Sequence, residues 1–473
     1  MGGCAIGISL EPYKSLGRIL GGQEVSRKPS KTKIDKLLAR ADEPKKYALK
    51  YHPYYRGKIE IALKAPVRTY EDFAVWYTPG VAEPCLRIKE RRELVFEMTN
   101  RWNTIAIVSD GTRVLGLGDI GPEAGLPVME GKSMLFKYLG GVDAFPLCIG
   151  TKNPEEIIQA VKWLQPSIGG VNLEDIEKPK CFYILDRLRR EMEIPIWHDD
   201  QQGTALVVAA GLISALKVVG KKMNEVSMAV IGAGSANTNC VKYLGVAGAD
   251  LKKFCVVDSK GILHKGRTEV EKEEPVKWDM VLKTNAEGRV GGIKEAMEGV
   301  DVCLAASKSG PGVIKKEWVA GMADDAIVFA CANPNPEIWP WEAEEAGARI
   351  VATGRSDFKN QVNNSLGFPA VFRGALDVSA KAITDEMCIE AADAISKYAE
   401  KRGLSEDYII PSMSETDMFI EEAVAVGMKA MEQGVARRKM SRKELRERSE
   451  ADIRKAQGVT NLLMRRKIIP PAP

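Results

Sequence analysis

Histidines, paired cysteines and long apolar runs are scarce in this sequence. The only three histidines are His52, His198 and His264, which argues against zinc sites built on several imidazoles and against a histidine-based triad. The nine cysteines are odd in number and have no C-x-x-C spacing, so we expect free thiols in a reducing compartment. No apolar run approaches the roughly 18 residues of a membrane span. We therefore expect a cytoplasmic protein without membrane contact, with an organellar matrix as the open alternative.

Charge is nearly balanced, with 68 Lys+Arg against 64 Asp+Glu and a net charge of +4, so electrostatics does not define the function. The positive excess is local, because residues 437–467 hold twelve basic and four acidic side chains. Such a tail can bind nucleic acid or an anionic surface, but a solvated helix face or an oligomer contact is commoner. We favour a homodimer or higher homo-oligomer and do not expect nucleic acid as a partner.

Short β-branched runs alternate with helical periodicity along the middle of the chain. Residues 104–109 have the length and composition of a buried strand, and residues 184–192 have helical periodicity. An Ala-rich helix is expected over 204–219, ended by Gly220. Further strands are expected at 170–173, 194–197, 226–231, 253–258, 300–305, 326–330 and 349–352. This alternation predicts an α/β fold with a doubly wound parallel sheet, followed by helices after residue 380.

The expected strand at 226–231 runs directly into a glycine-rich turn. Such a turn lets the backbone approach a pyrophosphate, and the start of the following helix offers free N–H groups. Asn237 replaces the third glycine of the usual fingerprint. Asp258 ends the next strand and would hold the ribose hydroxyls, which favours NAD slightly, whereas Lys260 could pair with the 2′-phosphate of NADP. The predicted cofactor-binding residues here are Gly232, Ala233, Gly234, Ser235, Ala236, Asn237 and Asp258.

Acidic pairs end two successive strands of this pattern. Glu174-Asp175 follows the strand at 170–173, and Asp199-Asp200 follows the next one. Ligands gather at the carboxyl ends of parallel strands, and the intervening helix makes these two strands neighbours. Carboxylate oxygens suit Mg²⁺ or Mn²⁺. Either pair alone is more often a helix cap or a solvated turn, but two pairs at successive strand ends favour a metal site.

Three further residues are candidates for acid–base chemistry or substrate binding. Lys132 follows a Gly-Pro loop and precedes a helical run; beside a divalent cation its pKa would be lowered, so that it could act as a base. Tyr77 lies at a turn, and Arg113 could bind a carboxylate through two hydrogen bonds. Taken singly, these residues are more often a surface lysine, a core tyrosine and a surface ion pair.

In combination, these segments resemble malic enzyme over about residues 70–380. The resemblance is carried by a tyrosine segment, a substrate loop, a lysine segment, two metal segments and two late asparagine segments. They occupy residues 77–84, 110–119, 127–132, 172–175, 198–205, 331–334 and 360–364. In length the chain is similar to the short forms of the family, although Gln202 stands where many of those have histidine.

The resemblance implies oxidative decarboxylation of L-malate to pyruvate and CO₂ with reduction of NAD⁺ or NADP⁺. Lys132, assisted by Asp199, would take the proton of the malate hydroxyl, and Tyr77 would protonate the enolpyruvate carbon. The implied ligands of Mg²⁺ or Mn²⁺ are Glu174, Asp175 and Asp200. The implied ligands of the substrate are Arg113, Asn333 and Asn364, with Asn333 also a candidate for the cofactor amide.

Two other functions stay open at this stage. One is redox-neutral decarboxylation of malate to lactate with NAD retained, and the other is a catalytically silent nucleotide-sensing or nucleic-acid-binding protein. The complete set of acid, base and metal candidates argues against the latter. The predicted domains are a helical arm over 1–50, a smaller α/β catalytic domain over 51–205, a Rossmann-like NAD(P)-binding domain over 206–380, and helices with the basic tail over 381–473.

Overall fold

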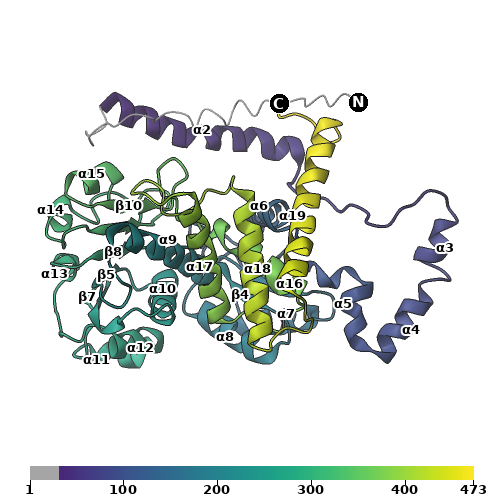
Figure 1. Ribbon diagram of the computed structural model, residues 1–473, viewed down its shortest axis with the longest axis horizontal. Helices are drawn as coiled ribbons and strands as arrows, with labels where there is room; N and C mark the ends of the chain where they lie inside the picture. Colours follow the sequence, from purple (N-terminus) through teal and green to yellow (C-terminus); the bar gives the residue numbers. More distant parts are fainter. Residues whose placement is uncertain (1–30) are drawn as a thin grey trace.

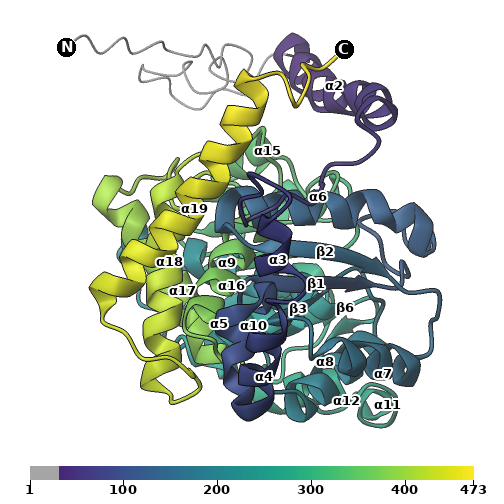
Figure 2. The ribbon, with the colours of Figure 1, turned by 90° about the vertical axis from the view of Figure 1, so that its right-hand side faces the viewer.

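A computed structural model describes the backbone of residues 31–473 and the side chains from residue 43 onward. The predicted amino-terminal arm is therefore described only from Lys31, where helix α2 (Lys31–Tyr55) begins. Figure 1 shows α2 lying across one edge of the molecule. The carboxyl-terminal residues reach α2, because Lys50 Nζ and Tyr55 OH each donate a 2.8 Å hydrogen bond to a main-chain carbonyl, of Pro473 and Pro470 respectively. Figure 2 shows the last helix, α19, rising toward this contact.

The first sheet is parallel and has four strands in the order β2-β1-β3-β4. Its strands are β1 (Thr104–Ser109), β2 (Asp143–Cys148), β3 (Gly170–Leu173) and β4 (Ile196–His198). The chain passes from β1 to β2 on one side and then crosses to β3 on the other. Loops after β1 and β3 therefore diverge at the carboxyl edge, which is where open α/β sheets bind ligands.

The second sheet has six strands in the order β10-β9-β8-β5-β6-β7, and only the short β7 is antiparallel. Its strands are β5 (Met228–Ile231), β6 (Phe254–Asp258), β7 (Gly261–Ile262), β8 (Val302–Ala305), β9 (Ile327–Ala330) and β10 (Ile350–Thr353). Here β5 has the next strand, β6, on one side and β8 on the other, so its carboxyl end is a topological switch point. Both sheets confirm the predicted doubly wound α/β class.

Helices cover both sheets and form the carboxyl-terminal part of the chain (Figure 1). Those of the first half are α3 (Asp72–Trp76), α4 (Ala82–Glu90), α5 (Val95–Met98), α6 (Pro122–Gly140), α7 (Pro154–Leu164), α8 (Lys180–Glu191) and α9 (Thr204–Val219). Around the second sheet lie α10 (Ser235–Val246), α11 (Thr268–Glu273), α12 (Pro275–Lys283), α13 (Ile293–Met297), α14 (Lys316–Val319) and α15 (Pro340–Glu345). The last four are α16 (Phe368–Asp377), α17 (Asp385–Arg402), α18 (Thr416–Glu432) and α19 (Arg442–Arg465).

Helix α9 is the central helix of the core. Together with the preceding turn it forms, over Asp199–Val219, the one stretch of the described residues that is long and apolar enough to cross a membrane. Its most apolar window is 72% buried inside the protein, which is the position of a core helix. It ends at Gly220 in the left-handed conformation, as the sequence predicts.

The structure differs from the sequence prediction in two instructive places. Strand β2 was not expected, because Pro146 interrupts its apolar run; as an edge strand, β2 tolerates the missing N–H donor. The predicted loop before Lys132 is wrong, since α6 begins at Pro122 and continues through Pro127 to Gly140. Proline is favourable in the first turn, and the later one costs a single helical hydrogen bond. Lys132 therefore projects from the middle of a helix.

Candidate active site

Three carboxylates converge where β3 and β4 end. One oxygen each of Glu174, Asp175 and Asp200 lies within 4.8 Å of the others. Glu174 and Asp175 are buried, whereas the Asp200 side chain is 34% exposed. Asp175 adopts a left-handed φ of 53°, and its backbone N–H donates a 2.9 Å hydrogen bond to Asp200. The structure thus brings together the three residues that the resemblance implies as metal ligands.

The electrostatics of this cluster suit a divalent cation. Burial, followed by the charge of Asp200, raises the pKa of Asp175 to about 7. Burial also raises the pKa of Glu174 well above its ordinary value, against the opposing charge of Lys132. Among the described residues, the buried Oδ2 of Asp175 has no hydrogen-bond partner. The mutual repulsion and burial of these carboxylates disfavour their charged forms, and a divalent cation would relieve both effects. Carboxylate oxygens are the ligands that Mg²⁺ or Mn²⁺ prefers, so the residues present fit the metal.

Lys132 lies between this cluster and a further buried acid. Its Nζ is 3.0 Å from Glu174 Oε1 and 2.5 Å from Asp199 Oδ2, and it lies 4.3 Å from the centroid of the Phe368 ring. The other oxygen of Asp199 accepts a 3.0 Å hydrogen bond from Trp197 Nε1. Lys132 is 8% exposed and Asp199 is fully buried. The amine is therefore held in one place by two carboxylates and an aromatic face.

The protein's own groups raise the pKa of Lys132, and the lowering expected beside a divalent cation stays a prediction. Burial does lower the pKa, but the charges of Asp199 and Glu174 outweigh burial and raise it above the ordinary value. These two carboxylates favour the ammonium form of Lys132. A divalent cation held by Glu174 and its neighbours would neutralise that carboxylate and repel the ammonium, which favours the free amine that a base requires. The sequence argument named Asp199 as a partner of Lys132, but in considering the pKa of the amine it took account of the cation alone and left out the charges of Asp199 and Glu174.

Asp199 and Asp200 belong to a π-helical turn, Asp199–Gly203, which joins β4 to α9. Turns of this type are rare and concentrate at functional sites. A Cβ at Gly203 would lie 2.1 Å from Asp199 Oδ1 and 3.1 Å from the Cβ of Asn364. Asn364 therefore lies beside the Lys132–Asp199 pair, as the resemblance implies for a substrate ligand.

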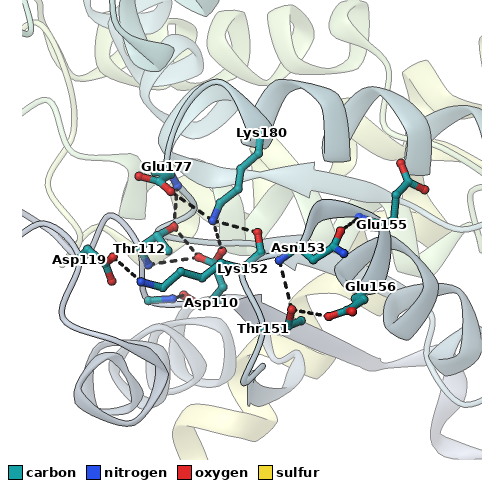
Figure 3. Close-up of polar contacts among 12 residues, drawn as sticks. Asp110, Thr112, Asp119, Thr151, Lys152, Asn153, Glu155, Glu156, Glu177 and Lys180 are labelled. Carbon is teal, nitrogen blue, oxygen red and sulfur yellow. Dashed lines mark hydrogen bonds and ion pairs between the residues drawn. The ribbon is translucent and has the colours of Figure 1, made fainter.

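A polar network fixes the loop that carries Arg113 (Figure 3). Asp110 is buried and pairs with Lys180 at 2.6 Å, and it accepts a 2.6 Å hydrogen bond from Thr112 Oγ1. Thr112 in turn accepts the backbone N–H of Glu177. These contacts join the loops that follow β1 and β3.

The Arg113 side chain is exposed, but its backbone N–H donates a 2.9 Å hydrogen bond to the Asp175 carbonyl. Leu115 N–H also donates to Asp175, at 3.2 Å to Oδ1. The backbone of Arg113 is therefore fixed beside the carboxylate cluster, while its side chain is exposed to solvent.

The glycine-rich turn lies at the switch point of the second sheet. Gly232 has a φ of 102°, and a Cβ there would lie 2.7 Å from the Ala306 carbonyl oxygen after β8. Helix α10 begins at Ser235 with no side-chain cap, so its first N–H groups are available for a phosphate. Asn237 is buried and donates to the Ile231 and Gly232 carbonyls, at 2.9 Å each. The Asn237 side chain thus stabilises the turn through hydrogen bonds, whereas a third glycine would allow the helix to pack closely on the strand.

Asp258 is already engaged by cations at the end of β6. Arg267 contacts both of its oxygens, at 2.7 and 3.1 Å, and Lys277 Nζ lies 3.4 Å away. Although burial alone would raise the pKa of Asp258, these partners and the backbone N–H of Lys260 hold it below the ordinary value. The sequence prediction for this residue omitted Arg267, which neutralises the carboxylate on which the slight preference for NAD rested.

Two buried amide contacts connect the nucleotide turn to the metal cluster. Asn239 on α10 donates a 3.0 Å hydrogen bond to Gln201 in the π-helical turn. Gln202 accepts from the backbone N–H of His198 at 3.0 Å and donates to the Tyr243 hydroxyl at 3.2 Å. Gln202 is thus a structural link between the two halves of the site.

The remaining two predicted residues lie at the periphery or outside. Asn333 is exposed and follows β9. Its main-chain carbonyl oxygen faces Gly116 of the substrate loop, and its side-chain Nδ2 faces Gly354. Tyr77 is 72% exposed and lies outside the body of the molecule, just after the short helix α3. Among the described residues, no side-chain hydrogen bond or ion pair joins Tyr77 to Lys132 or to the three carboxylates.

Comparison with known families agrees with this geometry. The model described as "Malic enzyme, N-terminal domain" matches residues 56–157, and "Malic enzyme, NAD binding domain" matches residues 201–433. The chain belongs to the malic enzyme family. It is an NAD(P)-dependent, decarboxylating oxidoreductase that acts on malate, as the resemblance implied.

Two of the relatives are covered over more than three quarters of their own length. The NAD-dependent malic enzyme of Geobacillus stearothermophilus is 48% identical over 382 residues, which are 81% of this chain and 78% of that enzyme. The bifunctional malic/malolactic enzyme of Bacillus subtilis is 46% identical over 402 residues, 85% of this chain and 97% of that one. The crystal structure of Entamoeba histolytica malic enzyme superposes with a TM-score of 0.90 at 46% identity, covering 94% of this chain and 93% of that one.

Proposed function

We propose that this malic enzyme uses Lys132 as the base that removes the proton of the malate hydroxyl. The observation that carries the proposal is the position of the Lys132 amine, 3.0 Å from Glu174 and 2.5 Å from Asp199 at the edge of the carboxylate cluster. Asp199, which Trp197 holds by a 3.0 Å hydrogen bond, keeps the amine oriented. A substrate oxygen beside the cluster is then within reach of the amine.

The other predicted residues have separate roles in this proposal. Glu174, Asp175 and Asp200 would hold Mg²⁺ or Mn²⁺. The cation supplies electrophilic stabilisation of charge developing on the substrate oxygens, and a nicotinamide bound near α10 supplies the hydride acceptor. Arg113 and Asn364 would orient the substrate carboxylates, and Asn333, whose main-chain carbonyl faces Gly116 of the substrate loop, would hold substrate or the cofactor amide.

Tyr77 completes the reaction by giving its hydroxyl proton to the carbon from which CO₂ has left. The tyrosine O–H bond breaks as the new C–H bond forms, and the phenolate recovers a proton from solvent. This role follows from the family resemblance and needs the hydroxyl to reach the bound product.

Steady-state turnover with malate, Mn²⁺ and either NAD⁺ or NADP⁺ tests the assignment. Lys132→Met should lower kcat by about 10²–10⁴-fold, the range for loss of a general base. The matched control is Lys137→Met on the same helix, because Lys137 is exposed and pairs with Asp143 instead. Full turnover in Lys132→Met would contradict the assignment of the base.

A second activity is favoured by one relative, the Bacillus subtilis enzyme whose name is bifunctional malic/malolactic. We propose, as a second candidate activity, decarboxylation of malate to lactate with the cofactor retained. Lactate should therefore be measured alongside the products of the oxidative reaction. Lactate formed without net reduced nicotinamide would reveal it, whereas pyruvate and reduced nicotinamide that each equal the malate consumed, with no lactate formed, would exclude it.

A further inference from the structure

One buried carboxylate joins the two loops that follow β8 and β9. Glu337 is fully buried, and its Oε1 accepts hydrogen bonds from the Ser307 backbone N–H at 2.8 Å and from the Ser307 hydroxyl at 3.1 Å. Its Oε2 accepts the Ala332 backbone N–H at 3.1 Å. Ser307 lies in the loop after β8, and Ala332 lies in the loop after β9. The carboxylate therefore fixes the distance between these loops.

Main-chain contacts strengthen this connection. The Gly310 N–H donates a hydrogen bond of 3.1 Å to the Asn335 carbonyl, which joins the two loops a second time. The loop after β9 is also held by Arg355, whose Nη1 donates a 2.9 Å hydrogen bond to the Pro334 carbonyl. We call residues 331–337 the asparagine loop, because they include Asn333. The loop is thus held by contacts with Glu337, with the loop after β8 and with Arg355.

The loop after β8 lies directly against the glycine-rich turn. A Cβ at Gly232 would lie 2.7 Å from the Ala306 carbonyl oxygen and 3.2 Å from the Cβ of Ser307. Ser307 is the residue whose N–H and hydroxyl Glu337 accepts, and Asn333 directly follows Ala332, the other partner of Glu337. Glu337 therefore connects the glycine-rich turn to Asn333 through two short paths of hydrogen bonds and chain.

The order of the strands indicates which half of the cofactor meets these loops. Strand β6, which ends at Asp258, lies on one side of β5, whereas β8 and β9 lie on the other side. If the adenosine ribose binds at Asp258 and the pyrophosphate at the glycine-rich turn, the remaining half of the cofactor extends over the ends of β8 and β9. Its nicotinamide end then meets the asparagine loop.

No ion pair accounts for the charge of Glu337. Its three hydrogen-bond donors are uncharged, and among residues 43–473 no cationic side chain pairs with it. Burial raises the pKa of Glu337 above its ordinary value, although the donors oppose this shift. What the carboxylate supplies is an acceptor on each of its two terminal atoms, which the amide of glutamine does not have. This property is what a connection between N–H groups of two loops requires.

We propose that Glu337 is a positioning residue for the nicotinamide end of the cofactor site. Its carboxylate holds Asn333 at a fixed distance from the glycine-rich turn, so that the asparagine loop is in place before the cofactor binds. A loop that is already ordered loses less entropy on binding, which increases affinity. This inference rests on the proposed contact of Asn333 with the cofactor amide, and it adds the residue that keeps Asn333 in position.

Binding of NAD⁺ and of ADP-ribose, which lacks the nicotinamide ring, tests the inference on the full chain without turnover. The 2′-phosphate forms of both ligands are used in parallel. In Glu337→Gln, the amide oxygen can still accept both Ser307 hydrogens, but the NH₂ group then faces the Ala332 N–H. We expect the Kd of NAD⁺ to rise about tenfold, as for the loss of one hydrogen bond to a charged group, and that of ADP-ribose to change by less than about twofold. Equal losses for the two ligands would overturn the inference.

Two further variants separate this inference from the proposed function. Glu317→Gln removes one charge from an exposed position on α14 and should leave both Kd values unchanged. If Asn333→Ala weakens NAD⁺ binding and Glu337→Gln does not, the inference is overturned while the role of Asn333 stands. If neither variant weakens NAD⁺ binding, the proposed contact of Asn333 with the cofactor amide is wrong as well.

The double variant Glu337→Gln/Asn333→Ala tests whether Glu337 acts through Asn333. If it does, the Kd of NAD⁺ should exceed that of Asn333→Ala alone by less than about twofold. Independent, multiplying losses would overturn the inference.

Hydrogen exchange of the protein without nucleotide gives a readout that needs no ligand. Amides of the asparagine loop should exchange about tenfold faster in Glu337→Gln than in the wild-type protein, whereas those of β5 should not change. If Glu337→Gln does not fold, Arg355→Gln, which removes another contact of the same loop, must show the faster exchange and the selective loss of NAD⁺ affinity. Unchanged exchange of the loop in the variant that folds would overturn the inference.

Discussion

Gly203 leaves the space that the Asp199 carboxylate occupies. A Cβ at position 203 would lie 2.1 Å from Asp199 Oδ1, well inside any allowed contact. Because Asp199 Oδ2 is also the nearest partner of the Lys132 amine, the glycine determines where the proposed base is held.

Gly203→Ala should therefore displace Asp199 and misplace the amine. We expect a loss of stability of about 1–3 kcal/mol, as for other overpacked sites, together with a marked fall in kcat. Thermal unfolding and steady-state kinetics measure the two effects. Gly131→Ala is the control, because a Cβ beside Lys132 at that helical position meets nothing within 4 Å. Normal kinetics in Gly203→Ala would show that Asp199 has freedom to move.

Metal affinity should depend on pH near neutrality. Burial and Asp200 place the pKa of Asp175 at about 7 in the metal-free protein, and the pKa of Glu174 is raised as well. Below that pH a proton occupies a ligand oxygen, so binding of Mn²⁺ must displace it. We expect affinity to fall by roughly tenfold per pH unit from pH 7 to pH 6, with proton release on binding. Calorimetric titration with Mn²⁺ in two buffers measures both, and a flat affinity over this range would contradict the prediction.

The Arg267–Asp258 pair should control the choice between NAD and NADP. Arg267 neutralises the carboxylate at 2.7 and 3.1 Å. Without the guanidinium, Asp258 would repel a 2′-phosphate while still accepting hydrogen bonds from ribose hydroxyls. Arg267→Gln should lower the ratio of kcat/KM for NADP⁺ to that for NAD⁺ by about tenfold. Lys265→Gln is a charge-matched control on the preceding loop. If Arg267→Gln left the ratio of the two kcat/KM values unchanged, the ribose 2′ position of the cofactor would not lie beside the Arg267–Asp258 pair, and the prediction would be wrong.

Glu422 should weaken the fold as the pH rises. It is fully buried on α18, and neither of its carboxylate oxygens has a hydrogen-bond partner among the described residues. Burial raises its pKa well above the ordinary value of 4.5. The unfolded chain loses this proton as the pH rises through that value while the folded chain retains it, so the penalty on folding grows above about pH 4.5.

Glu422→Leu should therefore stabilise the protein at pH 7 by about 1–3 kcal/mol and by much less at pH 4.5. Denaturant unfolding at the two pH values measures the difference. The control, Glu432→Gln at the exposed end of the same helix, should change the free energy of unfolding by no more than about 0.5 kcal/mol at either pH. An equal change in the free energy of unfolding at both pH values would contradict the prediction that Glu422 stays protonated in the folded protein.

Strands whose local composition is decisive could be predicted from the sequence. Features that depend on the position of a strand in the sheet, or on side chains distant in the sequence, could not. Strand β1 was predicted at its observed bounds, because β-branched residues fill it without interruption. Strand β2 was missed because its edge position, which permits Pro146, is a property of the whole sheet. The same holds in the site: the acidic pairs were visible at strand ends, but the contacts of Lys132 with Phe368 and of Asp258 with Arg267 depend on tertiary packing.

The π-helical turn Asp199–Gly203 also has a consequence for recognising distant relatives. Its wider winding lets two adjacent acids serve different partners, Lys132 for Asp199 and the Asp175 backbone for Asp200. Deleting one residue there would rotate helix α9 by about 100° relative to strand β4, as each helical residue does. A homologue with a shorter turn would retain the α/β fold but would lose the placement of these two acids on which the proposed activity depends. The spacing of this turn is therefore a criterion for separating active members from inactive descendants.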